Sequence, residues 1–153
     1  MSLADWLNSG WLTAHTTSRQ EIADLMAIAE RDIKDCQTPG LSSDWKHNIA
    51  YNAAIQLATA ALAACGYRAS REAHHFRVIQ SLSFSINAQS KVVAQLEKFR
   101  KKRNIGGYER AGIASDLEAA EMLSLAELLR KEFIQWLSEN HPELAPEGLL
   151  NKY

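Results

Sequence analysis

The chain has 153 residues, 46% of them hydrophobic, and its 17 basic and 18 acidic side chains leave a net charge of −1. This length fits one domain around one hydrophobic core and makes two independent domains unusual. The longest apolar run, residues 53–65, is too short to span a membrane, and the N-terminus lacks the basic and apolar regions of a signal peptide. We therefore expect a soluble, cytoplasmic protein that does not contact a membrane.

The first predicted helix runs from about Ser18 to Cys36. Ser18 and Glu21 have the spacing of a capping box, and the apolar residues that follow recur every three or four positions. Pro39 and Gly40 come directly after this pattern. Because proline and glycine interrupt helices, we expect the helix to end before them.

A second helix is predicted from residues 42–44 to Gly66. Serine and aspartate at its start are favourable caps, and glycine is a common residue at a helix C-terminus. One apolar side is expected to face the core, and it consists of Trp45, Ile49, Ala53, Leu57, Ala61 and Ala64. The many alanines of this helix permit close contact with its neighbours.

The third helical region is expected to begin near Ser70. Three of its residues are predicted to face the core: Phe76, Ile79 and Leu82. Residues 81–85 alternate serine with apolar side chains, a poor helix sequence, so we predict a break there. Helix is expected to resume near Asn87 and to end at residues 104–107.

The last predicted helix begins at a second capping box, formed by Ser115 and Glu118. Its apolar stripe consists of Met122, Leu125, Leu129, Phe133 and Leu137. His141 and Pro142 are expected to end it. Strand-like alternation is absent over any useful length, so the predicted fold class is all-α.

Amphipathic helices of this length bury their stripes against one another, which favours an up-and-down four-helix bundle with an interrupted third helix. We divide the chain into an N-terminal docking segment (1–17), a helical bundle (18–140) and a C-terminal tail (141–153). Trp6 and Trp11 are expected to dock the first segment on the bundle or on a second copy. The tryptophans as a group favour a homodimer.

The stretch from Lys91 to Arg110 concentrates the positive charge of the chain. It holds seven basic and two acidic side chains, which gives a charge of +5 and leaves −6 for the other residues. A basic patch on an acidic body suits a phosphate-bearing ligand, although such a run is also typical of a solvated helix face. The candidate RNA- or nucleotide-binding residues are Arg100, Lys101, Arg103, Asn104 and Tyr108.

Three short patterns resemble the HEPN domains of prokaryotes, with coverage of about residues 18–137. They are residues 29–35 on the first helix, residues 50–53 on the second, and residues 99–104 with Tyr108 near the end of the third. This resemblance implies a compact, usually dimeric helical bundle that binds RNA or nucleotides. It also implies a possible nucleotidyltransferase-type partner in a toxin–antitoxin or defence system.

Ribonuclease members of that family carry an arginine, often followed by a polar residue, and then a histidine a few positions later. Arg103 and Asn104 match the start of this motif, and Tyr108 stands where the histidine would be. An unperturbed tyrosine has a pKa near 10 and is a poor base at neutral pH, whereas histidine has a pKa near 6.5. The substitution favours binding over cleavage.

Two alternatives to a binding module remain. One is a metal-independent ribonuclease toxin in which Arg103 stabilises the phosphorane and Tyr108, or a histidine of the third helical region, transfers the proton. The other is a scaffold protein whose basic patch meets an acidic protein.

Four residues are expected to support the site: Arg31, Asp32, Tyr51 and Asn52. The first two are expected to form an ion pair, and of the other two we expect one to face a neighbouring helix and one to face a cleft. Asn104 is equally suited to cap its helix.

Adjacent histidines, His74 and His75, point about 100° apart on a helix and so do not form a metal site. Cys36 and Cys65 have no second ligand at a suitable spacing, and we expect two free thiols. We therefore predict no metal and no cofactor.

Overall fold

The computed structural model of the chain describes residues 1–106 and 112–149, and the side chains of residues 104–106 are outside this description. Its elements in chain order are α1 (Leu3–Asn8), β1 (Leu12–Ala14), α2 (Arg19–Asp35), α3 (Ser43–Ala64), β2 (Tyr67–Ala69), α4 (His74–Ser81), α5 (Ser90–Gly106), α6 (Asp116–Asn140) and the 3-10 helix η1 (Pro142–Leu144). The predicted all-α class is confirmed, because the described strands form one small two-stranded sheet.

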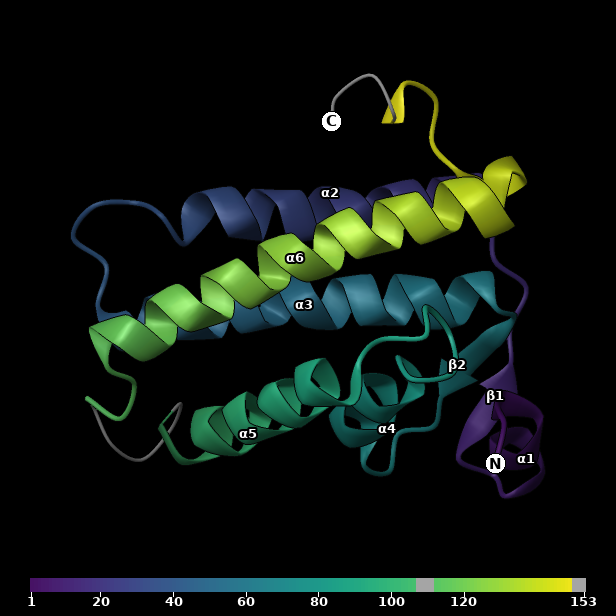
Figure 1. Cartoon of the computed structure of the whole chain (residues 1–153), viewed down its shortest axis with the longest axis horizontal. Coiled ribbons are helices and arrows are strands. Elements are labelled where there is room, and N and C mark those ends of the chain that lie inside the picture. Colours follow the sequence, from purple (N-terminus) through teal and green to yellow (C-terminus); the bar gives the residue numbers. More distant parts are fainter. Residues whose placement is uncertain (107–111, 150–153) are drawn as a thin grey trace.

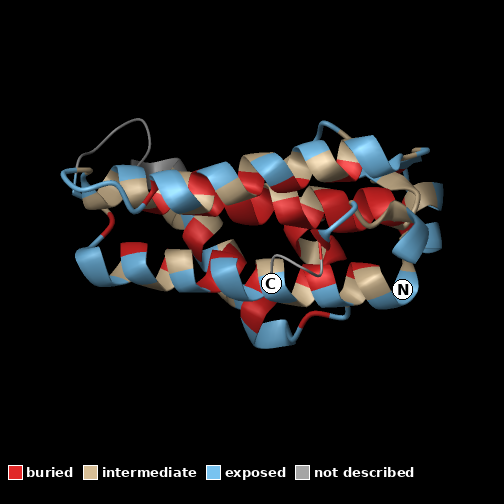
Figure 2. Cartoon of the chain, turned by 90° about the horizontal axis from the view of Figure 1, so that it is seen from above, coloured by how far each residue is buried: buried red, intermediate tan, exposed pale blue. Residues whose placement is uncertain are grey.

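Helix α3 lies in the middle of the molecule (Figure 1). Helices α2 and α6 cross on one side of it, and α4 and α5 lie on the other. Helices α2 and α5 run in one direction, whereas α3 and α6 run in the opposite direction. Figure 2 shows the buried residues gathered along the inner helix surfaces and the exposed ones on the outside.

Small side chains explain why α3 can occupy the central position. Its alanines are buried on more than one side of the helix, and Ala50, Ala53, Ala58, Ala60 and Ala61 are fully covered. Alanine permits close approach of neighbouring helices and has the highest helix propensity. The prediction that Trp45 faces this core is wrong: its side chain is 61% exposed, because it lies in the first turn of α3, beyond the packed region.

Capping fixes the helix ends near their predicted positions. The Ser115 hydroxyl accepts a hydrogen bond from the Glu118 N–H, and the Glu118 carboxylate accepts one from the Ser115 N–H, so the second capping box is complete. Ser18 caps α2 in the same way, but the Glu21 carboxylate instead contacts His15 Nε2 at 2.7 Å. Helix α6 ends where the His141–Pro142 pair predicts.

The predicted break in the third helical region is confirmed, since residues 82–89 separate α4 from α5. Helix α4 begins later than expected because residues 67–69 form β2, which pairs antiparallel with β1. Strands of three residues are too short to show alternation in the sequence.

The N-terminal segment packs on the end of α3, where Trp6 and Leu12 form a small buried cluster with Leu62. The guanidinium carbon of Arg77 lies 3.6 Å from the centroid of a Trp11 ring, a cation–π contact that ties α4 to this segment. At the other end of the chain, Leu149 is buried in the main core. Within the described ranges, no helix is both long and apolar enough to cross a membrane.

Candidate functional site

Three segments that lie far apart in the sequence converge on a hollow of about 280 Å³, which we call the Arg103 hollow. Its lining residues come from α2, α3 and α5, and they are Arg31, Asp32, Trp45, Asn48, Ile49, Asn52 and Arg103. Each of the three segments carries one of the patterns singled out in the sequence. The helix packing therefore brings Arg31, Asp32, Asn52 and Arg103 together, as a shared site requires.

Asp32 is the buried hydrogen-bond acceptor of the hollow and is only 6% exposed. Its carboxylate accepts hydrogen bonds from Arg31 Nε and Nη2, both at 3.1 Å, and from Asn52 Nδ2 at 2.7 Å. The predicted Arg31–Asp32 pair is thus present. Because the Arg31 side chain is 62% exposed, this pair contributes little stability, and the shorter bond from Asn52 fixes the carboxylate.

Of Tyr51 and Asn52, one was predicted to face a neighbouring helix and the other to face a cleft. Tyr51 is buried between helices, whereas Asn52 lines the Arg103 hollow. The guanidinium carbon of Arg103 lies 5.3 Å from the centroid of the Tyr51 ring, within cation–π range. This contact holds the Arg103 side chain near the mouth of the hollow.

Arg103 differs from two of its basic neighbours on α5, Arg100 and Lys102, which form ion pairs. Arg100 forms a two-bond ion pair with Glu97, at 2.6 and 2.9 Å, and Lys102 Nζ lies 2.9 Å from Glu118 Oε2. Considering only described residues, Arg103 has no carboxylate partner. The positive charge counted in the sequence is therefore partly neutralised, and Arg103 retains its capacity to bind an anion.

His75 belongs to the third helical region, whose histidines were rejected as metal ligands but kept as possible proton-transfer groups. Its Nδ1 atom lies 3.2 Å from the Tyr51 hydroxyl. Burial lowers the pKa of His75 and the nearby charges of Arg103 and Arg100 lower it further, so the imidazole is neutral at neutral pH. Burial raises the pKa of the Tyr51 phenol above its ordinary value, against the effect of Arg103 and Arg100. Both groups are therefore uncharged.

A second hollow of about 420 Å³, here the His75 hollow, lies between α4 and α5. It is lined by Ala73, His74, His75, Phe76 and Arg100. The prediction that Phe76 faces the core is wrong, because its half-buried ring belongs to neither hydrophobic cluster of the described residues. Ile79 and Leu82, the other two residues of this prediction, are buried, whereas Phe76 lies in the first turn of α4.

The end of α5 is tied to α6 by the ion pair between Lys102 and Glu118. This ion pair and the bond from the Ser115 N–H lower the pKa of Glu118 to about 2. Asp44 of α3 accepts hydrogen bonds from the N–H groups of Gly112 and Ala114, which ties α3 to the segment before α6. The predicted contacts of Asn104 and Tyr108 lie outside the described residues and stay predictions.

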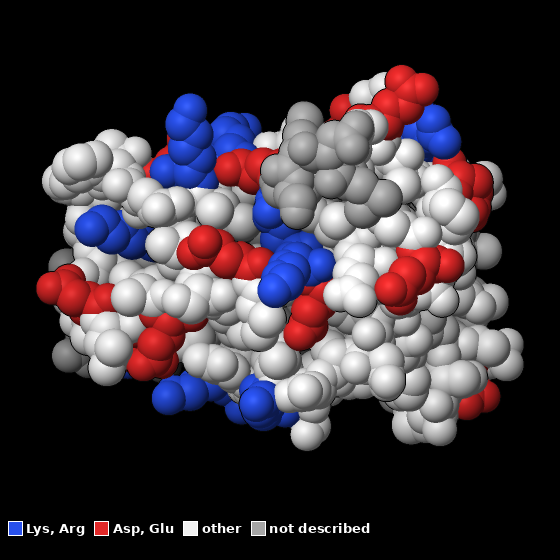
Figure 3. All heavy atoms as spheres, turned by 45° about the horizontal axis from the view of Figure 1, so that its top comes forward, with Lys and Arg blue, Asp and Glu red and all other residues white. Residues whose placement is uncertain are grey.

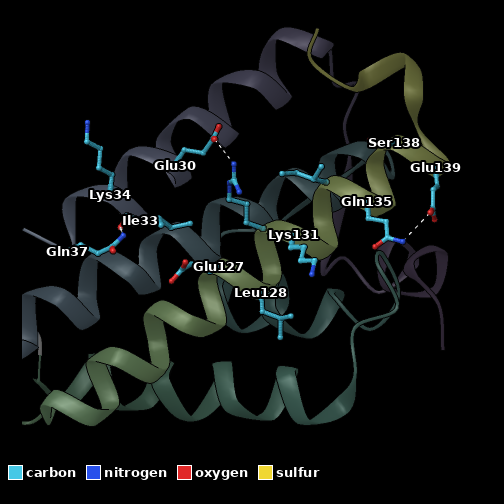
Figure 4. A pocket seen from close by; sticks show the side chains of 12 residues that line it. Glu30, Ile33, Lys34, Gln37, Glu127, Leu128, Lys131, Gln135, Ser138 and Glu139 are labelled. Atoms are coloured by element: carbon cyan, nitrogen blue, oxygen red, sulfur yellow. Dashed lines mark hydrogen bonds and ion pairs between the residues drawn. The ribbon is translucent and has the colours of Figure 1, made fainter. Parts of the chain in front are cut away.

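A third hollow is a groove of about 910 Å³ between α2 and α6 (Figure 4). Ile33 and Ile134 supply apolar surface, and Lys34, Glu127 and Lys131 surround it with charges of both signs. Figure 3 shows the same mixture of acidic and basic side chains across this face of the molecule. The groove shares no lining residue with the Arg103 hollow.

Among residues 1–106 and 112–149, no group of three or more histidine, cysteine or acidic side chains is arranged to hold a metal. Both cysteines are free thiols. Comparisons with protein-family models, with curated proteins and with solved structures find no match to this chain.

Proposed function

We propose that the protein is a HEPN-like helical bundle that binds RNA or nucleotides. The observation that carries this proposal is Arg103: its guanidinium lies beside an aromatic ring at the mouth of a polar hollow, and no described carboxylate neutralises it. Arginine offers a planar set of donors that matches a phosphate group. A charged donor held in this way is suited to a phosphate.

The other residues of the Arg103 hollow suit the rest of a nucleotide. Asn48 and Asn52 carry amides, which donate and accept hydrogen bonds and so can contact ribose hydroxyls or base edges. The charge of Asp32 is already compensated by Arg31 and Asn52, which reduces its repulsion of a phosphate. Lys101 is exposed on the same helix and adds long-range attraction.

Binding to single-stranded RNA should show the salt dependence of a few phosphate contacts. With two or three contacts, the logarithm of the association constant should fall against the logarithm of salt concentration with a slope of about −1.4 to −2.1. Fluorescence anisotropy at several salt concentrations measures this slope. Lys131→Ala, in the groove between α2 and α6, is the matched control and should leave the slope unchanged. Absence of binding at low salt would refute the proposal.

A metal-independent ribonuclease is the second candidate, and His75 is the observation that favours it. A neutral imidazole between two arginines is able to take the proton of a 2′-hydroxyl while a guanidinium stabilises the phosphorane. We expect any cleavage of RNA to disappear in both Arg103→Ala and His75→Gln. Cleavage that survives His75→Gln but not Tyr108→Phe would assign proton transfer to Tyr108 instead.

We further propose that the protein is a homodimer and that it acts with a nucleotidyltransferase-type partner in a toxin–antitoxin or defence system. Leu128 is 43% exposed on α6 and borders two hollows, one of them the groove beside α2. If this face pairs two copies, Leu128→Glu should convert a dimer into a monomer in light scattering, with the helical circular-dichroism spectrum retained. A wild-type protein with the mass of one chain at micromolar concentration would contradict the dimer.

A further inference from the structure

The His75 hollow is lined mainly by flat side chains. Three of the five residues that line it, His74, His75 and Phe76, have flat aromatic rings, and a fourth, Arg100, has a flat guanidinium. A nucleobase is likewise flat, with apolar faces and a polar edge. Proteins bind unpaired bases by stacking them on aromatic rings and arginine planes.

Arg100 is suited to recognise a planar group because its orientation is fixed. Glu97 holds its guanidinium through two hydrogen bonds, and its guanidinium carbon lies 5.8 Å from the centroid of the Phe76 ring. An ion pair that involves two parallel bonds restricts rotation of the guanidinium. The positive charge of Arg100 is largely compensated by Glu97. This side chain therefore offers a flat stacking surface rather than an unpaired charge for a phosphate.

Phe76 contacts the guanidinium groups of Arg77, at 5.3 Å, and Arg100, at 5.8 Å, instead of packing in the core. It packs in neither described hydrophobic cluster, although the neighbouring Val78 and Ile79 are buried in the core. An aromatic ring left half-buried at the edge of a hollow, beside an arginine on the adjacent helix, provides a stacking surface.

The two hollows are adjacent. Arg103 and Arg100 lie one turn apart on α5, a rise of about 4.5 Å along the helix axis. Between them, Tyr51 contacts Arg103 through its ring and His75 through its hydroxyl. One ligand can therefore reach both hollows along the surface of α5, from Arg103 to Arg100.

We infer that the His75 hollow is a stacking subsite for a nucleobase, and that the ligand is single-stranded RNA of more than one nucleotide. The phosphate of one nucleotide binds Arg103, and the base of the neighbouring nucleotide stacks on Phe76. This inference rests on the proposed function and adds the length and single-stranded form of the ligand.

The test compares a short single-stranded adenosine oligonucleotide with adenosine monophosphate. Phe76→Ala and Phe76→Leu should each weaken oligonucleotide binding by about five- to a hundredfold, because both remove the stacking ring. Binding of the monophosphate should be unchanged. Phe84→Ala is the matched control, since Phe84 is 39% exposed and contacts Trp6 instead. Phe76→Leu preserves apolar volume in case the alanine variant unfolds.

Wild-type oligonucleotide affinity in a folded Phe76→Leu variant would overturn the inference. Equal losses for the oligonucleotide and the monophosphate would also overturn it, because base and phosphate would then belong to one nucleotide. Arg103→Ala separates the two proposals. If that variant loses binding while Phe76→Leu does not, the proposed function stands without the subsite, and if no RNA binds the wild type, both fail.

Discussion

Replacement of Arg103 by alanine is expected to weaken RNA binding by about five- to 150-fold at constant salt. This range corresponds to about 1–3 kcal/mol for a charge-assisted hydrogen bond to phosphate. The effect should be large because Arg103 lines a partly enclosed hollow and has no carboxylate partner among the described residues. The variant should keep its helical spectrum, since the side chain contributes to no core cluster. Fluorescence anisotropy gives the affinities.

Lys101→Ala is the matched control for this experiment. Lys101 lies on the same helix and carries the same charge, but its side chain is exposed. Its interaction with a phosphate is screened by water and salt, so the loss should be far smaller. Equal losses of RNA affinity in the two variants would show that Arg103 acts only as part of a general basic surface.

Replacement of Phe133 by alanine is expected to destabilise the protein by about 3–5 kcal/mol, the usual cost of removing a buried aromatic ring. Phe133 is fully buried in the α6 stripe, and its ring lies 6.1 Å from that of Trp136. Truncation of the ring leaves a cavity beside α3, because the small alanine side chains of α3 cannot fill the space of the lost ring. Urea unfolding followed by circular dichroism measures the change.

Leu128→Ala provides the comparison on the same helix. Leu128 is 43% exposed, so its truncation should cost about 0.5 kcal/mol or less. If both substitutions had the same effect, the assignment of inward and outward faces of α6 would be wrong.

The all-α class and most helix ends could be predicted because their causes are local. A serine hydroxyl that binds an N–H three residues later lies within one turn, as at Ser18 and Ser115. All five residues predicted for the stripe of α6 are buried, and the structure adds Ala119, Ala126 and Ile134 to them. Central α3 was harder, because a helix buried on several sides shows weak periodicity. Trp45 was misplaced because its first turn of α3 extends beyond the packed region.

The sequence also identified four residues of the Arg103 hollow, through patterns on three helices, but their mutual positions depend on how these helices pack. Tertiary structure alone decided which cation of α5 is neutralised, because the partner of Lys102 belongs to α6. It also decided the position of His75, which meets Tyr51 across 24 residues of sequence, and the exposure of Phe76. Ion pairing and burial depend on distances between helices, and no local pattern of residues encodes those distances.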